Sequence, residues 1–196
     1  MNTPPMIETY ITIFAVVSSL IGSYFIIRLN WKRYGLLFLI SGILANILCY
    51  IFVTMGFYSF PYRLFPSLSP MPFDVVLTVF PFAVLISVRY SPKSWYYKIF
   101  FYWCIVHMGM LAETLVLTQT KLINYDFKWD FWDSYTWWWI FFLLFEWIGG
   151  RIIPEHLRKP ISADAFKLGN WAWILFHFIV ILTIFLGGVY LGFVLK

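Results

Sequence analysis

Long apolar stretches separated by short polar segments dominate this chain. A helix that crosses a bilayer needs about 20 consecutive apolar residues. Six stretches approach or exceed that length, over residues 7–27, 34–57, 73–88, 95–117, 135–152 and 171–195. The third is the shortest and contains Pro81. The pattern predicts an all-α integral membrane protein, a bundle of six transmembrane helices that forms a single domain over residues 1–196.

The composition agrees with a membrane protein and excludes a soluble or disordered chain. Hydrophobic residues make up 62% of the 196 residues and charged residues only 12%. An ordinary soluble domain is about 45–50% apolar and about 25% charged. The net charge is +5, but the cations lie in short connections between apolar stretches. Membrane lipids, and not nucleic acid, are therefore the expected surroundings.

The distribution of the 14 Lys and Arg residues predicts an orientation in the membrane. Ten of them fall in the first, third and fifth connections: Arg28, Lys32, Arg33, Arg89, Lys93, Lys98, Arg151, Arg158, Lys159 and Lys167. Connections rich in Lys and Arg stay in the cytoplasm. The expected topology is multi-pass, with the N-terminus and the C-terminus both outside the cytoplasm.

A proline-rich segment, FPYRLFPSLSPMPFD, covers residues 60–74 between the second and third stretches. It cannot be a continuous helix, because an interior proline removes a backbone donor and clashes with the preceding turn. Irregular backbone at membrane depth must be satisfied by protein or water. Two placements remain open: an outer interfacial loop, or a shallow segment that re-enters the membrane.

Part of the chain resembles an uncharacterised family of small multispanning membrane proteins from spore-forming bacteria. The resemblance covers about residues 60–153. It rests on Phe60-Pro61-Tyr62-Arg63, Pro66, Phe73-Asp74, Pro81, Arg89-Tyr90, Pro92, Trp95 and Ala112-Glu113. Thr114 stands where the family often has proline. The resemblance implies a bacterial cytoplasmic-membrane protein and importance for Arg63, Asp74 and Glu113, with no activity attached.

Four acidic or basic residues lie deep in the apolar stretches, at least four positions from either end: His107, Glu113, Glu146 and His177. A charge at that depth costs at least about 2.5–3.5 kcal/mol, so each is a candidate substrate or proton site. Asn46 is a neutral companion. For His107, a neutral imidazole that bonds to a neighbouring helix is the alternative to a role as a ligand or proton carrier.

Two pairs are expected from matched depth. Glu146 and His177 lie equally far from the predicted inner boundary, either as a clamp between helices or as a proton-coupled site reached from the cytoplasm. Arg63 is expected within hydrogen-bond reach of Glu113 or Asp74. A salt bridge there would pin the proline-rich segment to the bundle, a purely structural role.

Small residues recur four positions apart on three stretches, as Ser18 and Gly22, Ser41 and Ala45, and Gly188 and Gly192. This spacing lets helix backbones approach closely. Packing within the monomer and a contact in a homo-oligomer, or with a partner membrane subunit, both fit the pattern.

Three classes of function fit these features. The first is a small transporter or permeation protein that uses intramembrane Glu and His. The others are a structural or accessory membrane subunit and a lipid-directed intramembrane enzyme. The sequence contains no HExxH, GxGxxG, phosphate-loop or GxSxG motif, and the catalytic residues stay unassigned. No metal and no cofactor is expected.

Overall fold

The computed structural model describes residues 7–127, 129–166 and 170–194. Within these ranges lie six α-helices and two very short strands. The helices are α1 (Ile7–Ile27), α2 (Trp31–Thr54), α3 (Phe73–Tyr90), α4 (Trp95–Gln119), α5 (Phe131–Ile152) and α6 (Asn170–Val194). The strands are β1 (Tyr58–Ser59) and β2 (Asn124–Tyr125), and two single-turn 3-10 helices, Glu155–Leu157 and Ala163–Phe166, lie between α5 and α6.

The helices occupy the six apolar stretches, and polar caps account for two shifted starts. The side chain of Asn30 accepts a hydrogen bond from the backbone N–H of Arg33 at 3.2 Å, so α2 begins three residues before the apolar stretch. Asp130 and Asp133 form a capping box, so α5 begins four residues early, at Phe131. Such caps supply partners for backbone N–H groups that a helix leaves unpaired at its start.

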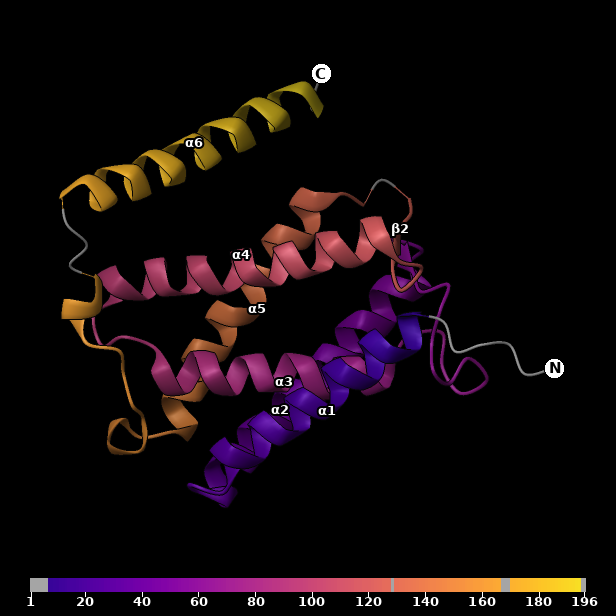
Figure 1. Cartoon of the computed structure of the whole chain (residues 1–196), viewed down its shortest axis with the longest axis horizontal. Helices are drawn as coiled ribbons and strands as arrows, with labels where there is room; N and C mark the ends of the chain where they lie inside the picture. Colours follow the sequence, from indigo (N-terminus) through magenta and orange to yellow (C-terminus); the bar gives the residue numbers. More distant parts are fainter. Residues whose placement is uncertain (1–6, 128, 167–169, 195–196) are drawn as a thin grey trace.

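Helix α3 is the centre of the packing. It contacts α1, α2 and α5, and α4 packs against α5. Figure 1 shows the connections gathered at two opposite ends of the molecule, with the start of α1, β2 and the α2–α3 segment at one end. Helix α6 lies beside α4 in this view. Aromatic contacts join α6 to α4 and α5: His177 lies against Phe100, and Tyr190 lies against Trp132.

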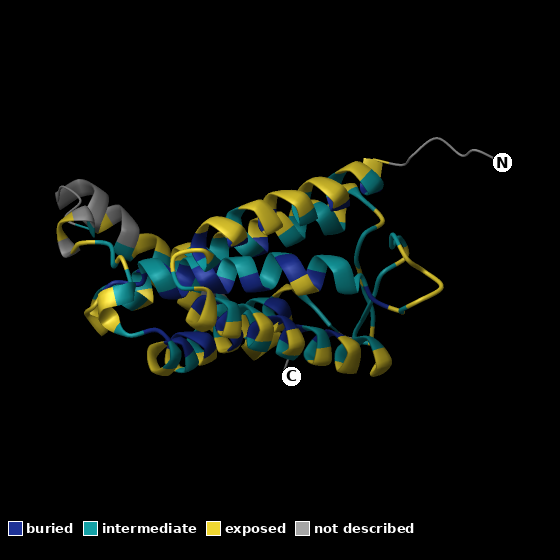
Figure 2. Ribbon diagram, turned by 90° about the horizontal axis from the view of Figure 1, so that it is seen from below, coloured by how far each residue is buried: buried dark blue, intermediate teal, exposed yellow. Residues whose placement is uncertain are grey.

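The outer faces of the helices are apolar. Figure 2 shows exposed residues along these faces and buried residues between the helices. Large apolar side chains such as Phe14, Leu39 and Phe185 are more than half exposed, a surface that suits lipid and not water. Among the described residues, α1 to α4 are long and apolar enough to cross a membrane by length and composition. We conclude that the protein is helical and membrane-associated.

Close contacts at small residues join α3 to its neighbours. A Cβ on Gly42 of α2 would lie 2.9 Å from the Leu77 side chain and 3.2 Å from the ring of Pro81. Gly22 of α1 lies against the ring of Phe82. Gly22 and Gly42 thus pack within the monomer, whereas Ser18 of α1 is exposed and Gly188 of α6 has open space where a Cβ would stand.

Hydrogen bonds join the α2–α3 connection to the α4–α5 connection, at the end of the molecule where the two β-strands lie. Strands β1 and β2 pair antiparallel, with Tyr58 opposite Tyr125. The Ser59 hydroxyl donates to the Asp126 carboxylate at 2.5 Å, and the backbone N–H of Tyr62 donates to the carbonyl of Lys121 at 3.0 Å. The proline-rich segment is non-helical up to Phe73, where α3 begins.

Candidate functional site

A cavity of about 690 Å³ lies between the helices. Residues of α1 to α5 and of both connections at the β-strand end line it, and nearly all of the lining is apolar. Glu113 is the one ionisable acidic or basic side chain among the described lining residues. Cavities of about 300–1,000 Å³ with few polar groups are typical of sites for small ligands.

The carboxylate of Glu113 accepts three hydrogen bonds from neutral donors. The Tyr125 hydroxyl and the Ser134 hydroxyl donate to Oε1 at 2.6 and 2.7 Å. The indole N–H of Trp138 donates to Oε2 at 2.6 Å. Ser134 in turn accepts from the indole N–H of Trp129 at 2.9 Å. Helix α5 and strand β2 thus fix a carboxylate of α4 at the edge of the cavity.

The tyrosine donor in this cluster stays protonated. Burial, and then the neighbouring Glu113 carboxylate, raise the pKa of Tyr125. Burial likewise raises the pKa of Tyr58, which faces the same cavity from β1. At neutral pH both phenols are therefore neutral hydrogen-bonding groups.

Aromatic rings form the wall beside this cluster. The ring of Phe52 lies 5.2 Å from that of Trp129 and 4.8 Å from that of Trp137, centroid to centroid. Tyr58 meets Trp129 edge to face at 5.4 Å. All four residues line the cavity. The cavity therefore combines one carboxylate with several aromatic side chains.

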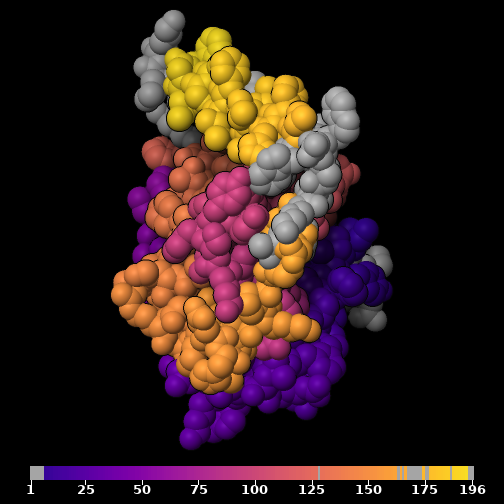
Figure 3. Space-filling model, turned by 90° about the vertical axis from the view of Figure 1, so that its left-hand side faces the viewer, coloured from indigo at the N-terminus to yellow at the C-terminus, as the bar shows by residue number. Residues whose placement is uncertain are grey.

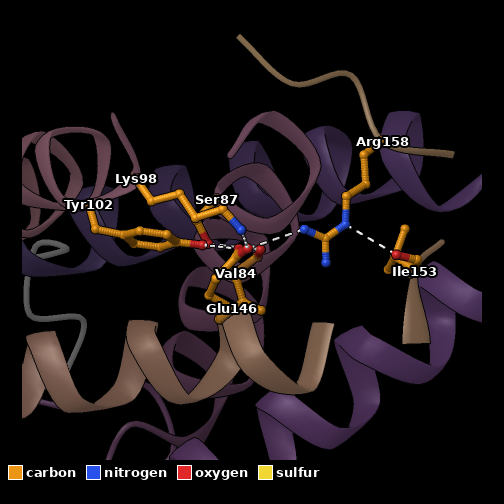
Figure 4. Close-up of polar contacts among 7 residues, drawn as sticks. All are labelled: Val84, Ser87, Lys98, Tyr102, Glu146, Ile153 and Arg158. Carbon is orange, nitrogen blue, oxygen red and sulfur yellow. Dashed lines mark hydrogen bonds and ion pairs between the residues drawn. The ribbon is translucent and has the colours of Figure 1, made fainter. Parts of the chain in front are cut away.

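A second polar cluster surrounds Glu146 on α5 (Figure 4). Its side chain is 2% exposed. Lys98 and Arg158 both form ion pairs with Oε1, the latter at 3.2 Å, and the Tyr102 hydroxyl donates to Oε2 at 2.7 Å. The cation side chains are only 12% and 10% exposed. One carboxylate thus holds two nearly buried cations.

The segment after α5 covers the end of the molecule at which the Glu146 cluster lies. Figure 3 shows it, in orange, against the α3–α4 connection. The backbone N–H groups of Lys159 and Ile161 donate to the carbonyls of Arg89 and Tyr90 at 2.9 and 3.1 Å. Arg158 also donates to the carbonyl of Ile153 at 3.1 Å. The Glu146 cluster is therefore a joint between α4, α5 and this segment.

The expected pairing of Glu146 with His177 is wrong. Among the described contacts, Glu146 is held by groups of α4 and of the segment after α5, and none of α6. His177 lies with its ring 5.9 Å from that of Phe100. The reason is that the chain turns back after α5. Arg158 then occupies the position beside Glu146 that was predicted for the histidine.

The expected pairing of Arg63 with Glu113 or Asp74 is also wrong. The carboxylate is occupied by the donors of α5 and β2, while the guanidinium of Arg63 donates to the carbonyl of Phe60. Nε of Arg63 and Oδ2 of Asp74 are each buried without a hydrogen-bond partner among the described residues. Pairing of β1 with β2 explains the difference, because it places Tyr125 beside Glu113.

The two other candidates bond within their own helices. Nδ1 of His107 lies 2.8 Å from the carbonyl of Trp103, so this nitrogen carries the proton. Its ring meets that of Tyr135 on α5 edge to face at 5.4 Å. The amide of Asn46 donates to the carbonyl of Gly42 at 2.8 Å. The polar bond of His107 is thus made inside α4, not to a neighbouring helix.

Sequence reasoning missed the residues that complete both clusters. Lys98 and Arg158 counted only as loop cations, and Ser134 and Trp138 were not among the predicted site residues. A helical spacing of four was the available signal. It places Lys98 and Tyr102 on one face of α4, and Ser134 and Trp138 on one face of α5.

The described residues contain no group of three or more His, Cys, Asp or Glu side chains that could hold a metal ion. No family model, curated protein or solved structure matches this chain. The two clusters and the cavity between the helices are therefore the basis for a functional proposal.

Proposed function

We propose that this chain is a small transporter of the bacterial cytoplasmic membrane, which binds a largely apolar solute in the cavity between its helices. The cavity beside Glu113 carries the proposal. A protein that only packs against a partner has no need for so large an opening, since protein interiors are close-packed. The lining suits an apolar body, and Glu113 supplies one fixed polar contact.

We further propose that the chain crosses the membrane six times. Helices α5 and α6 have 22 and 25 residues, or about 33 and 37 Å at helical rise. Both lengths exceed the roughly 30 Å of a bilayer's hydrocarbon core. The single buried acid of α5, Glu146, is neutralised by its cations. The connections rich in Lys and Arg then lie in the cytoplasm, and the proline-rich segment lies as a loop at the outer interface.

The topology predicts a labelling pattern in intact cells. Cysteines introduced at Asn2 and Lys196, each in a background without Cys49 and Cys104, should react with an impermeant thiol reagent. A cysteine at Ser162 should react only after the cells are opened. Labelling at Ser162 in intact cells would contradict the proposed orientation.

Filling the cavity should abolish solute binding. Ile105 of α4 lines the cavity, so Ile105→Trp is expected to weaken binding of the neutral dye N-phenyl-1-naphthylamine at least about tenfold, or ~1.4 kcal/mol. The measurement is dye fluorescence on purified protein, above that of empty micelles. The control is Leu111→Trp, since Leu111 lies on the same helix and is 55% exposed. Equal binding by both variants and the wild type would mean that the solute does not bind in the cavity.

A structural role as an accessory subunit is the second candidate. The Glu146 cluster favours it, because a buried carboxylate with two cations and a tyrosine is a fixed joint between helices. Such clusters serve structure as readily as chemistry. If the dye experiment shows no saturable binding, this candidate replaces the transporter.

A further inference from the structure

The charge of Glu113 has no counterion among the described residues, which do not include Lys128. Glu146 and Glu155 each form an ion pair there, whereas Glu113 forms none with a described residue. All three groups that bind the Glu113 carboxylate are neutral. They satisfy its hydrogen-bonding capacity but supply no positive charge. In this respect Glu113 is the opposite of Glu146, which holds two cations.

A negative charge at the edge of an apolar cavity favours a positive charge in that cavity. Coulomb attraction is stronger there than in water, because the surroundings screen it less. The same field repels an anion that enters. The carboxylate therefore discriminates between solutes of the same shape by the sign of their charge.

The aromatic rings of the cavity wall also favour a cation. The rings of Trp129, Trp137 and Trp138, with those of Phe52 and Tyr58, line the cavity next to this carboxylate. Aromatic faces attract organic cations, and tryptophan attracts them most strongly. The apolar remainder of the lining binds the body of a solute and offers nothing to a small hydrated ion such as Na⁺.

We propose that the cavity selects lipophilic organic cations, whose charged centre lies between Glu113 and the tryptophan rings while the apolar body fills the space between the helices. This assignment rests on the proposed function, because it names the class of solute. Fatty acids and other anionic amphiphiles are rejected by the charge of Glu113. Neutral apolar molecules bind, but more weakly.

Three probes with the same phenyl groups test the selectivity: tetraphenylphosphonium, neutral triphenylphosphine oxide and anionic tetraphenylborate. Each is equilibrated with the purified full-length protein in non-ionic detergent, with empty micelles as reference. We expect the cation to bind at least about tenfold more tightly than the neutral probe, a difference of ~1.4 kcal/mol. Tetraphenylborate should show no saturable binding.

The variant Glu113→Gln should remove this preference. Its affinity for tetraphenylphosphonium is expected to fall to that for the neutral probe, while the affinity for the neutral probe is retained. Glu155→Gln is the matched control, because it removes the same charge from an exposed side chain outside the cavity and should change neither affinity. In the Ile105→Trp variant, binding of both probes should be lost.

The outcomes separate this inference from the proposed function. Equal binding of the three probes by the wild type, abolished by Ile105→Trp, would overturn the cation selectivity and leave the cavity as a solute site. Cation binding unchanged in a folded Glu113→Gln variant would also overturn it. Absence of saturable binding for every probe would overturn both proposals. If Glu113→Gln does not fold, the probe series on the wild type and on Ile105→Trp decides.

Discussion

Replacing Glu146 by glutamine is expected to destabilise the protein by about 3–5 kcal/mol. The substitution keeps the size of the side chain but removes its charge, which leaves Lys98 and Arg158 nearly buried, close together and uncompensated. Breaking a buried ion pair by removing one partner typically costs this much, because the other charge stays out of water. The measurement is the thermal midpoint of the purified protein, together with the fraction recovered as a single species in detergent.

Two comparisons make this prediction specific. Glu155→Gln removes the same charge from an exposed ion pair with Lys93, whose atoms lie 3.9 Å apart, and should cost at most about 1 kcal/mol. Adding Lys98→Met to Glu146→Gln should recover part of the lost stability, since it removes one of the two buried cations that have no counterion in the Glu146→Gln variant. Equal stability of the Glu146→Gln and Glu155→Gln variants would mean that the buried cluster contributes little to the fold.

The second large effect is expected at the contact between α5 and α3. A Cβ on Gly149 would lie 2.6 and 2.7 Å from the two methyl carbons of Val88. Val88 is fully buried, and its branched side chain has little freedom to move aside. Gly149→Ala should therefore destabilise the protein by about 1–3 kcal/mol through overpacking. Thermal midpoints in detergent report the change.

The neighbouring glycine provides the control. A Cβ on Gly150 would meet its nearest heavy atom, Nη2 of Arg158, at an ordinary 3.5 Å. Gly150→Ala should therefore be neutral or stabilising, by up to about 1 kcal/mol, because alanine favours a helix more than glycine does. The double substitution Gly149→Ala with Val88→Ala should recover stability relative to Gly149→Ala alone. Loss of stability at Gly150 but not at Gly149 would contradict the packing described.

The partners of the polar side chains between the helices could not be predicted from local sequence patterns. The proposed partner of Glu146 was chosen by depth along two straight helices, and depth alone cannot say which face of each helix meets the other. One of its two cations instead comes from Arg158, twelve positions further on, because the chain after α5 turns back over the end of α3. For Glu113, the decisive contact comes from Tyr125 through the pairing of β1 with β2.

The helical, membrane-associated character of the protein and the positions of its helices could be predicted from the amino-acid pattern alone. These properties follow from the length and apolarity of each stretch, which are local, and from caps such as Asn30 and Asp130 that act within a few residues. Which polar groups meet, and where a cavity remains, could be seen only in the folded protein. Those depend on helix rotation and on close contacts such as Gly149 with Val88, which arise from the packing of all helices together and not from any one stretch.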